Sequence, residues 1–238
     1  MKTPNDSFIM QSRFDSRLLE SARQILALAG NGQAESSFEF DGQLYRVGKG
    51  VFSPAFFKSS SLLTYFLPYP IGGRFLEIGC GCGLTTIYSI KCGVEYALGI
   101  DINKAAVLCS RNNAKRLQVD ADFRFGDVFS SLSESDGVFD LVYWNLPFIH
   151  VDSSYEPKNI IELSLLDPGL RAFKCFLKGV REWIAEQGRV FVAFSEEEGS
   201  IRFNRLLDEY AMYGILIKNW PGVVDENPVT LQLYEVKW

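Results

Sequence analysis

The chain has 238 residues, of which 47% are hydrophobic and 22% are charged, and its formal net charge at pH 7 is −5. This length fits one α/β domain with a short extra segment, and the composition is that of an ordinary globular protein. The acidic balance argues against a protein that grips long stretches of nucleic acid, because such proteins usually carry a basic stripe. The polar start of the chain and its lack of long apolar runs predict a cytoplasmic protein without a signal peptide or membrane span.

The first 50 residues predict a small appendage. Apolar residues recur at helical spacing over residues 16–29, and a Gly-Asn-Gly sequence ends that helix. The stretch Ser37–Val47 has Asp41-Gly42 at its centre between apolar and aromatic residues, which is typical of a β-hairpin. We therefore expect residues 1–50 to form a helix-and-hairpin appendage or lid, and residues 51–238 to form the main domain.

From residue 74 onward the pattern predicts strands that alternate with helices. The expected strands are 74–78, 96–100, 122–125, 139–144, 189–194, 215–220 and 230–236, and the expected helices are 84–91, 104–116, 169–186 and 200–213. Asp167 is expected to cap the helix over 169–186, with Pro168 as its first residue. The alternation predicts a mainly parallel sheet with helices on both faces. Because no helix separates the last two strands, we expect a hairpin-like or antiparallel ending.

A strand runs directly into the glycine loop, the sequence Gly-Cys-Gly-Cys-Gly of residues 79–83, and then into a helix. Glycines allow a sharp turn and a close approach to a ligand, and the helix offers free N–H groups. A dinucleotide loop needs a third small residue where Leu84 stands. Glu77 before the turn repels a pyrophosphate but accepts a hydrogen bond from an ammonium group. The loop therefore favours a nucleoside ligand with an amino acid and no phosphate; an ordinary tight turn is the alternative.

Acidic residues follow the next two strands. Asp101 lies 22 residues after the first glycine of the loop, near the position of an acid that binds both ribose hydroxyls. Capping of the next helix by Asp101 or Asn103 is the alternative. Asp127 follows the third strand, where it is able to accept from an adenine amino group while Ile102 and Val128 sandwich the ring. Gly-Asp is also common turn chemistry, so the Asp127 signal is weak by itself.

The fourth strand ends in Asn145-Leu146-Pro147-Phe148, at the edge where open α/β sheets bind ligands. An amide or ring amino nitrogen is a poor nucleophile because its lone pair is delocalised. The Asn145 side-chain oxygen and the Leu146 carbonyl are able to accept its two protons, which orients the nitrogen and favours charge build-up as a methyl group arrives. Pro147 stiffens the turn, and Phe148 offers a flat face to a planar substrate. A strand end with a proline stop and a core aromatic is the alternative.

Further candidates are singled out by their position. His150, the single histidine, follows this loop and is a candidate general base or substrate-orienting group; a polar loop residue is the alternative. Lys58 and Tyr155 are candidate substrate contacts by placement only. The absence of a signal peptide predicts reduced cysteines. The spacing of Cys80 and Cys82 is poor for zinc, so no metal site is expected.

Together these motifs resemble class I S-adenosylmethionine (AdoMet)-dependent methyltransferases over roughly residues 48–238, within them the small-domain N-methyltransferases that carry Asn-Pro-Pro-Tyr or Asn-Pro-Pro-Phe. Residues 163–170 are similar to the region after this motif in the protein-glutamine methyltransferases that modify translation release factors. The resemblance implies an α/β, Rossmann-like sheet of seven strands, mainly parallel with an antiparallel last strand, and AdoMet as cofactor. Leu146 replaces the first proline of the motif, which keeps the carbonyl but changes the pocket shape.

The resemblance also implies roles for individual residues. The implied cofactor-binding residues are Glu77, Gly79, Cys80, Gly81, Gly83, Asp101, Ile102, Asp127, Val128 and Asn145. The implied catalytic loop is Asn145, Leu146, Pro147 and Phe148, to which His150 is added as a hypothesis. The implied closing segment contains Phe52, Ser53 and Pro54.

The leading interpretation is an enzyme that methylates a planar amide or amino nitrogen on a small molecule, peptide or protein. The alternatives are an rRNA or nucleobase N-methyltransferase, an O-methyltransferase of a biosynthetic pathway, a nicotinamide oxidoreductase, and an AdoMet-binding scaffold without activity. The acidic charge disfavours bulk RNA as a partner, and the glycine spacing disfavours a nicotinamide cofactor. No membrane partner is expected, and the sequence leaves the substrate, the accepting atom and the oligomeric state open.

Overall fold

The computed structural model describes residues 20, 23–24, 26, 35–56, 59–147, 149–196, 199–224 and 227–238. The helix predicted over residues 16–29 lies mostly outside the described residues, as do Lys58 and Phe148. Within the described ranges, no helix is both long and apolar enough to cross a membrane.

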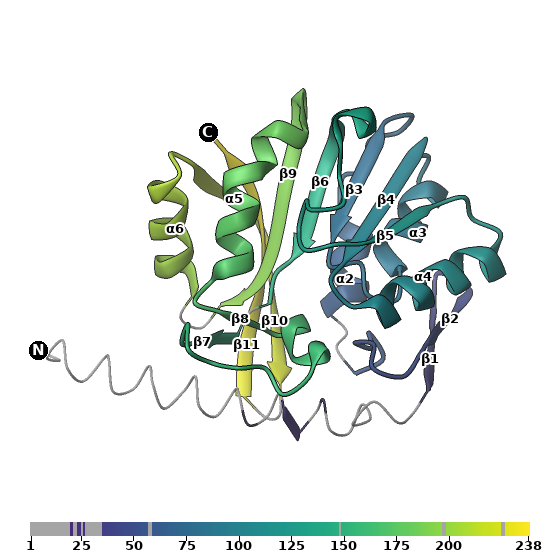
Figure 1. The fold of residues 1–238 in the computed structure, drawn as a ribbon, viewed down its shortest axis with the longest axis horizontal. Helices are drawn as coiled ribbons and strands as arrows, with labels where there is room; N and C mark the ends of the chain where they lie inside the picture. Colours follow the sequence, from purple (N-terminus) through teal and green to yellow (C-terminus); the bar gives the residue numbers. More distant parts are fainter. Residues whose placement is uncertain are drawn as a thin grey trace, which may run out of the picture.

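The main structure is a central seven-stranded sheet in the order β10-β11-β9-β6-β3-β4-β5 (Figure 1). The strands are β3 (Arg74–Ile78), β4 (Tyr96–Asp101), β5 (Asp122–Phe125), β6 (Phe139–Asn145), β9 (Ile184–Glu196), β10 (Tyr213–Val224) and β11 (Asn227–Lys237). Strand β11 is inserted between β9 and β10 and runs antiparallel to both, whereas β5, β4, β3, β6 and β9 are parallel. The predicted sheet with its antiparallel last strand is confirmed.

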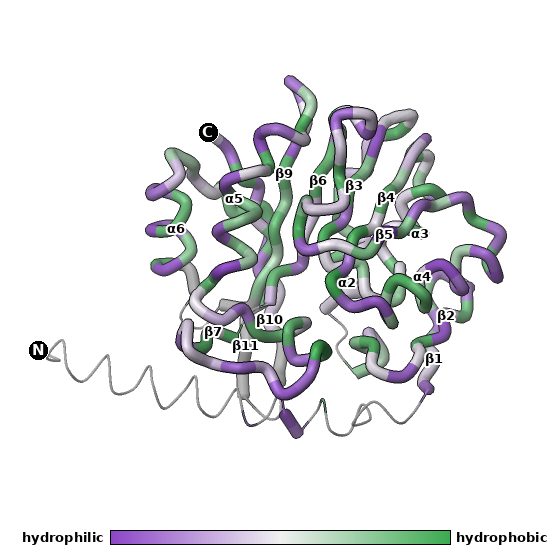
Figure 2. The backbone as a smooth tube through the Cα atoms, viewed as in Figure 1, coloured by the Kyte–Doolittle hydropathy of each residue, from purple (hydrophilic) through white to green (hydrophobic). Residues whose placement is uncertain are grey.

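Helices cover both faces of this sheet. They are α2 (Ser59–Phe66), α3 (Leu84–Lys91), α4 (Lys104–Leu117), α5 (Arg171–Trp183) and α6 (Gly199–Glu209). Helices α2, α3 and α4 contribute to the two apolar clusters on one face, and α5 and α6 pack on the other. Figure 2 shows that the central strands are largely hydrophobic, while each helix carries both hydrophobic and hydrophilic residues within its turns. This is the pattern of a parallel sheet buried between amphipathic helices.

The N-terminal hairpin forms as predicted. Strands β1 (Ser36–Phe40) and β2 (Gln43–Val47) pair antiparallel. The connecting Asp41 and Gly42 have φ angles of 49° and 67°, and two positive φ angles are the requirement of a tight type I′ turn. Apolar side chains of the hairpin share one buried cluster with α3 and α4, so the hairpin is attached to the main sheet through the helix layer.

The start of α5 differs from the prediction. Residues Leu166–Pro168 form a short strand, β8, which pairs in parallel with β7 (Ile149–Val151). Asp167 is therefore not the N-cap and Pro168 is not the first helical residue. The Asp167 carboxylate instead accepts hydrogen bonds from two backbone N–H groups in the first turn of α5, at 3.0 and 2.9 Å. Asp167 thus pairs backbone N–H groups that have no acceptor within the helix, although it is not the N-cap residue.

Two predicted helix ends were also wrong. Helix α5 ends at Trp183 rather than at residue 186, because β9 begins at Ile184. Helix α6 ends at Glu209 rather than at residue 213, where β10 begins. The sequence analysis did not identify α2, the β7–β8 pair or the 3-10 turns η1 (Glu134–Asp136) and η2 (Ile160–Ser164). The strands of the β7–β8 pair and the two 3-10 turns have too few residues to show a period.

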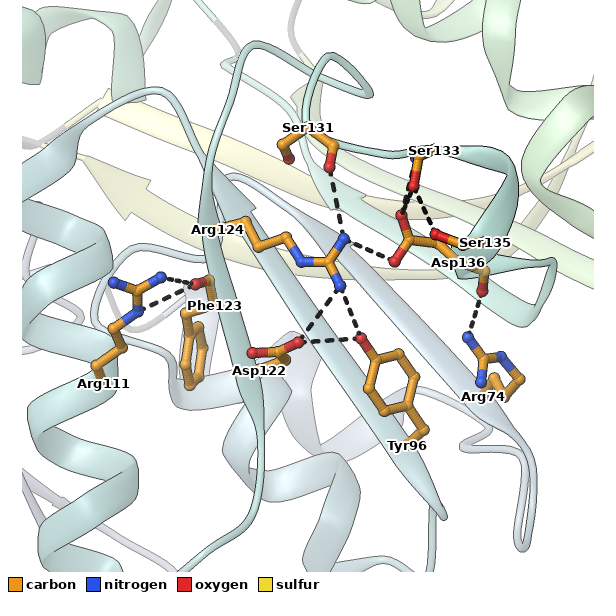
Figure 3. A network of polar contacts seen from close by, with 10 residues as sticks. All are labelled: Arg74, Tyr96, Arg111, Asp122, Phe123, Arg124, Ser131, Ser133, Ser135 and Asp136. Carbon is orange, nitrogen blue, oxygen red and sulfur yellow. Dashed lines mark hydrogen bonds and ion pairs between the residues drawn. The ribbon is translucent and has the colours of Figure 1, made fainter.

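A polar network joins the amino ends of β3, β4 and β5 to the loop that contains η1 (Figure 3). Arg124 donates to the Asp136 carboxylate at 2.7 Å and to the Tyr96 hydroxyl at 3.4 Å, and Arg74 donates to the Asp136 carbonyl at 2.6 Å. Burial raises the pKa of Asp136, but hydrogen bonds from Ser133 and Arg124 outweigh it and hold the pKa below its ordinary value. Side chains at the amino ends of these strands are therefore bonded to one another. A ligand site is expected at the carboxyl ends of the strands instead.

Candidate functional site

A cavity lies at the carboxyl ends of β3, β4, β5 and β6. This is the edge at which open α/β sheets bind their ligands. The predicted site residues that line it are Phe52, Pro54, Glu77, Gly79, Cys80, Gly81, Asp101, Ile102, Asp127, Val128, Asn145, Leu146 and Pro147. Motifs that lie far apart in the sequence therefore face one common space.

The glycine loop follows β3 with a left-handed backbone. Gly79, Gly81 and Gly83 have φ angles of 69°, 55° and 83°, in the region that L side chains rarely adopt. An added Cβ would meet no atom within 4 Å at Gly81, but would lie 3.1 Å from Trp144 Nε1 at Gly79 and 2.8 Å from Ser110 Cβ at Gly83. Gly83 is not among the lining residues of the cavity; the absence of a Cβ there lets α4 pack closely, and its predicted role in cofactor binding stays a prediction.

Glu77 places a buried carboxylate at the end of β3. It accepts hydrogen bonds from the Thr86 backbone N–H at 2.9 Å and from the Thr86 hydroxyl at 2.5 Å. Burial raises the pKa of Glu77 to about 8, while hydrogen bonds from Thr86 and Thr85 oppose the rise. A cationic group bound in the cavity would favour the ionised form. The site thus holds a carboxyl whose charge depends on what binds beside it.

Asp101 ties the end of β4 to the glycine loop. Its Oδ2 accepts from the Gly81 backbone N–H and its Oδ1 from the Asn103 backbone N–H, both at 2.8 Å. Burial raises the pKa of Asp101, and these two N–H groups oppose the rise. Asn103 is the N-cap of α4, because its side chain accepts from the Ala105 backbone N–H at 3.0 Å. The helix cap is therefore assigned to Asn103, and Asp101 lies at the cavity.

The loop after β5 forms another part of the lining. The Gly126 backbone N–H donates to the last carbonyl of β4 at 3.0 Å, which fixes this loop beside the glycine loop. Asp127 is exposed and Val128 is buried. The φ of 52° at Val128 is unusual for a β-branched residue, and such outliers concentrate at ligand-binding sites. Ile102 lines the same cavity from the β4 side.

The chain that leaves β6 stays on the edge of the sheet. The Leu146 backbone N–H donates to the Ala193 carbonyl of β9 at 2.7 Å. A proline at this position has no N–H and is unable to make that bond. Leu146 is buried, while Asn145 and Pro147 are partly exposed and line the cavity with it. The leucine of this motif therefore anchors the strand end through its own backbone.

Two predicted substrate or lid residues do not line the cavity. Ser53 is buried and shares a hydrogen bond of 2.9 Å with the Ser36 hydroxyl, so it attaches the closing segment to the hairpin. The Tyr155 hydroxyl accepts from Arg23 at 2.8 Å and donates to Glu162 at 2.9 Å. Tyr155 holds the loop between β7 and η2 and is not a lining residue.

Three other predicted residues lie wholly or partly outside the described part of the structure. Phe148 and Lys58 are not described, and their roles stay predictions. His150 lies in β7 with its backbone opposite Asp167, but its side chain is not described.

The sequence analysis missed one side of the cavity. This side is lined by Ser59, Ser60, Ile160, Ile161, Leu163, Ser164, Leu165, Leu166, Asp167, Pro168, Arg171, Ala172 and Leu231. The apolar run over residues 160–166 was the available signal. A run of this kind does not by itself distinguish a cavity wall from a packed core.

Solved structures show which fold this is. The chain superposes on a ribosomal protein L11 methylase from Lactobacillus delbrueckii with a TM-score of 0.55 and 13% identity, over 80% of this chain and 83% of the other. It superposes on a T. thermophilus 16S rRNA methyltransferase, solved with AdoMet and guanosine, with a TM-score of 0.58 and 18% identity, over 85% of this chain and 50% of the other. The sheet and its helices therefore have the Rossmann-like fold of class I methyltransferases.

The sequence assigns the chain to a family. Residues 45–163, which are 119 of the 238, match the methyltransferase small domain family. The chain belongs to this family.

Curated relatives match over shorter stretches. The chain is 37% identical over 75 residues to the ribosomal protein L11 methyltransferase of Thermotoga neapolitana, which covers 32% of this chain and 27% of the relative. It is 33% identical over 111 residues to a Methanocaldococcus jannaschii protein named for protein N5-glutamine methyltransferase activity, which covers 47% of this chain and 54% of that protein. The matches thus span about a quarter to a half of these relatives.

Proposed function

We propose that this chain is an AdoMet-dependent N-methyltransferase that acts on a planar amide or amino nitrogen of a small molecule or peptide. One observation carries the proposal: a single cavity joins the glycine loop, Asp101 and Asp127 to the strand end Asn145-Leu146-Pro147. Family membership and the names of the relatives, which are protein methyltransferases, support methyl transfer.

The residues around the cavity fit AdoMet, which carries an amino acid, a ribose and an adenine but no phosphate. Carboxylates line the cavity, and an added Cβ at Gly81 would extend into open space there. We assign Glu77, Gly79, Cys80 and Gly81 to the amino-acid part, Asp101 to the ribose hydroxyls, and Ile102, Asp127 and Val128 to the adenine. When bound, AdoMet supplies an electrophilic methyl group on a positively charged sulfur.

The residues after β6 orient the acceptor in this proposal. The Asn145 side-chain oxygen and the Leu146 carbonyl accept the protons of the acceptor nitrogen, which directs its lone pair and stabilises the positive charge that develops on it. The bond from the Leu146 N–H to the Ala193 carbonyl anchors the chain immediately before that carbonyl. His150 is the candidate to take the proton that the nitrogen loses. Preorganisation of acceptors in this way is the main means by which a protein accelerates such a transfer.

The closing segment and the hairpin complete the proposal. Phe52 and Pro54 line the cavity, which supports a role for residues 50–54 in covering bound ligands. We keep the division into an appendage of residues 1–50 and a methyltransferase domain of residues 51–238.

Ligand-induced thermal stabilisation tests the cofactor. We expect AdoMet and S-adenosylhomocysteine to raise the melting temperature and NAD and NADP to leave it unchanged, since a ligand at about 100 times its Kd adds roughly 2.7 kcal/mol. Asp101→Ala should lose the response, whereas Asp120→Ala, an exposed residue outside the cavity, should keep it. Stabilisation by NAD alone would overturn the proposal.

A second variant separates cofactor binding from catalysis. Asn145→Ala should lose about 100-fold or more in methyl transfer, the usual effect of removing one preorganised hydrogen-bonding group, and a much smaller factor in affinity for S-adenosylhomocysteine. Transfer of labelled methyl from AdoMet to peptide, nucleoside and small-molecule amine panels measures this. Full activity in Asn145→Ala would exclude the assigned role.

A further inference from the structure

The cavity wall beyond Asn145 is largely apolar. It is built by the segment between β7 and α5, with contributions from Phe52, Pro54 and Leu231; the apolar lining residues of that segment are Ile160, Ile161, Leu163, Leu165, Leu166 and Pro168. Ile160 lines the cavity yet remains 43% exposed. Apolar surface left open inside a cavity is what a site for an apolar ligand presents.

Hydrogen bonds and apolar contacts within the chain hold this wall in place. The buried carboxylate of Glu162 accepts hydrogen bonds from the Tyr155 hydroxyl and the Lys158 backbone N–H, each at 2.9 Å. Ile161 and Leu165 pack with residues of β7 in a buried cluster. Because these contacts lie within the chain itself, the apolar wall is already formed before an acceptor binds.

Charged residues around the cavity are unevenly distributed. Glu77 and Asp101 lie at the ends of β3 and β4, and Asp127 follows β5, all on the side assigned to the cofactor. The Asp167 carboxylate is occupied by N–H groups of α5. Among the described residues that line the cavity, Arg171 is the single basic one. The part of the cavity next to the apolar wall therefore has one basic side chain, the exposed Arg171, near the Asp167 carboxylate. Burial raises the pKa of Asp167, and the charge of Arg171 is among the interactions that oppose the rise.

The position of this arginine is informative. Arg171 lies in the first turn of α5, where the helix dipole is positive and a cation is unfavourable. The neighbouring Asp167 is already satisfied by backbone N–H groups, so the guanidinium retains donors for a ligand. A carboxylate on the acceptor would match the fork of N–H donors that arginine presents.

We propose that the methyl acceptor is a small, largely apolar molecule that carries a carboxylate, with its apolar body against the Ile160–Pro168 wall and its carboxylate bound by Arg171. This inference rests on the proposed methyltransferase function and specifies its substrate. A peptide glutamine matches the site less well, because its side chain is neutral and polar. RNA matches it less well because this cavity has one basic lining residue and the chain carries a net charge of −5.

Binding to the protein loaded with S-adenosylhomocysteine tests the acceptor class. The probes are an aminonaphthoate, its neutral carboxamide and a blocked Gly-Gln-Gly tripeptide, and calorimetry measures each affinity. We expect the aminonaphthoate to bind about tenfold tighter than the carboxamide, the range of one charge-assisted contact. Arg171→Gln should remove this preference. Lys178→Gln removes the same charge from an exposed position on the same helix outside the cavity and should keep it.

A variant of the apolar wall tests the apolar part of the proposed acceptor site. Ile160→Asp should lower the affinity for both naphthalene probes. Circular dichroism and S-adenosylhomocysteine binding establish that each variant is folded. Equal affinities for the carboxylate and the carboxamide, a preference that survives Arg171→Gln, or binding of the tripeptide alone would each overturn the inference while the cofactor still binds. Failure to bind S-adenosylhomocysteine in the wild type would instead refute the proposed function itself.

Discussion

Replacement of Glu77 by glutamine should change how the stability of the ligand-free protein depends on pH. The Glu77 carboxyl is buried, and burial raises its pKa from 4.5 to about 8. Between these two values the folded protein holds a proton that the unfolded chain has lost, so stability falls as the pH rises. Linkage gives a loss of about 3 kcal/mol for the wild type between about pH 5 and pH 8. Glutamine does not titrate, so Glu77→Gln should avoid this loss.

Urea denaturation of both proteins across this pH range measures the effect. The unfolding free energy of Glu77→Gln minus that of the wild type should increase by about 3 kcal/mol from about pH 5 to pH 8. Glu95→Gln changes an exposed glutamate in the same way, and its difference from the wild type should stay constant. A difference for Glu77→Gln that is constant within about 1 kcal/mol would show that the carboxyl is ionised throughout, and would refute the argument from burial.

The second and third glycines of the loop should respond differently to alanine. Gly81→Ala should cost about 1–2 kcal/mol of backbone strain and abolish stabilisation by S-adenosylhomocysteine. Gly83→Ala places a Cβ 2.8 Å from a side-chain carbon of α4, so it should lower the melting temperature more than Gly81→Ala does. Equal melting temperatures of the two variants would contradict this assignment. Tyr155→Phe removes the hydrogen bond to Glu162, which supports the apolar cavity wall. This variant should raise the KM for the acceptor several-fold and leave the Kd for AdoMet unchanged. An unaltered KM would show that the wall does not depend on the Tyr155 hydroxyl. Asp136→Ala removes charge-assisted bonds at the far end of the sheet and should cost about 1–3 kcal/mol near neutral pH. Because the pKa of Asp136 is lowered on folding, that cost should shrink as the pH falls below the ordinary aspartate range, which acid-range urea titrations measure.

Elements with strong local signals were predictable from the sequence. The strand Arg74–Ile78 and the helix Leu84–Lys91 were placed at their observed bounds. The apolar run of the strand, the apolar residues of the helix and the glycines between the two elements are visible in the local sequence. The same holds for the Asp41-Gly42 turn, because its backbone angles are demanded by two adjacent residues.

The capping residue at α5 was not predictable in this way. Asp167 has the local features of an N-cap, but the pairing of β8 with β7 fixes the chain as a strand there. That pairing joins segments separated by about fifteen residues, and no local propensity encodes it. The capping function survives because the side chain still reaches the N–H groups of α5.

The sequence by itself determined which motifs this protein carries, because the glycine loop, the acids at strand ends and the Asn145 loop are each written in a few consecutive residues. Only the tertiary structure decided that those motifs line one common cavity. It assigned the helix cap to Asn103 and left Asp101 at the cavity. It also brought the apolar run after residue 160 and the charge of Arg171 to the same space. The physical reason is that chain order fixes local conformation, whereas a cavity is formed by segments that only sheet pairing and helix packing bring together.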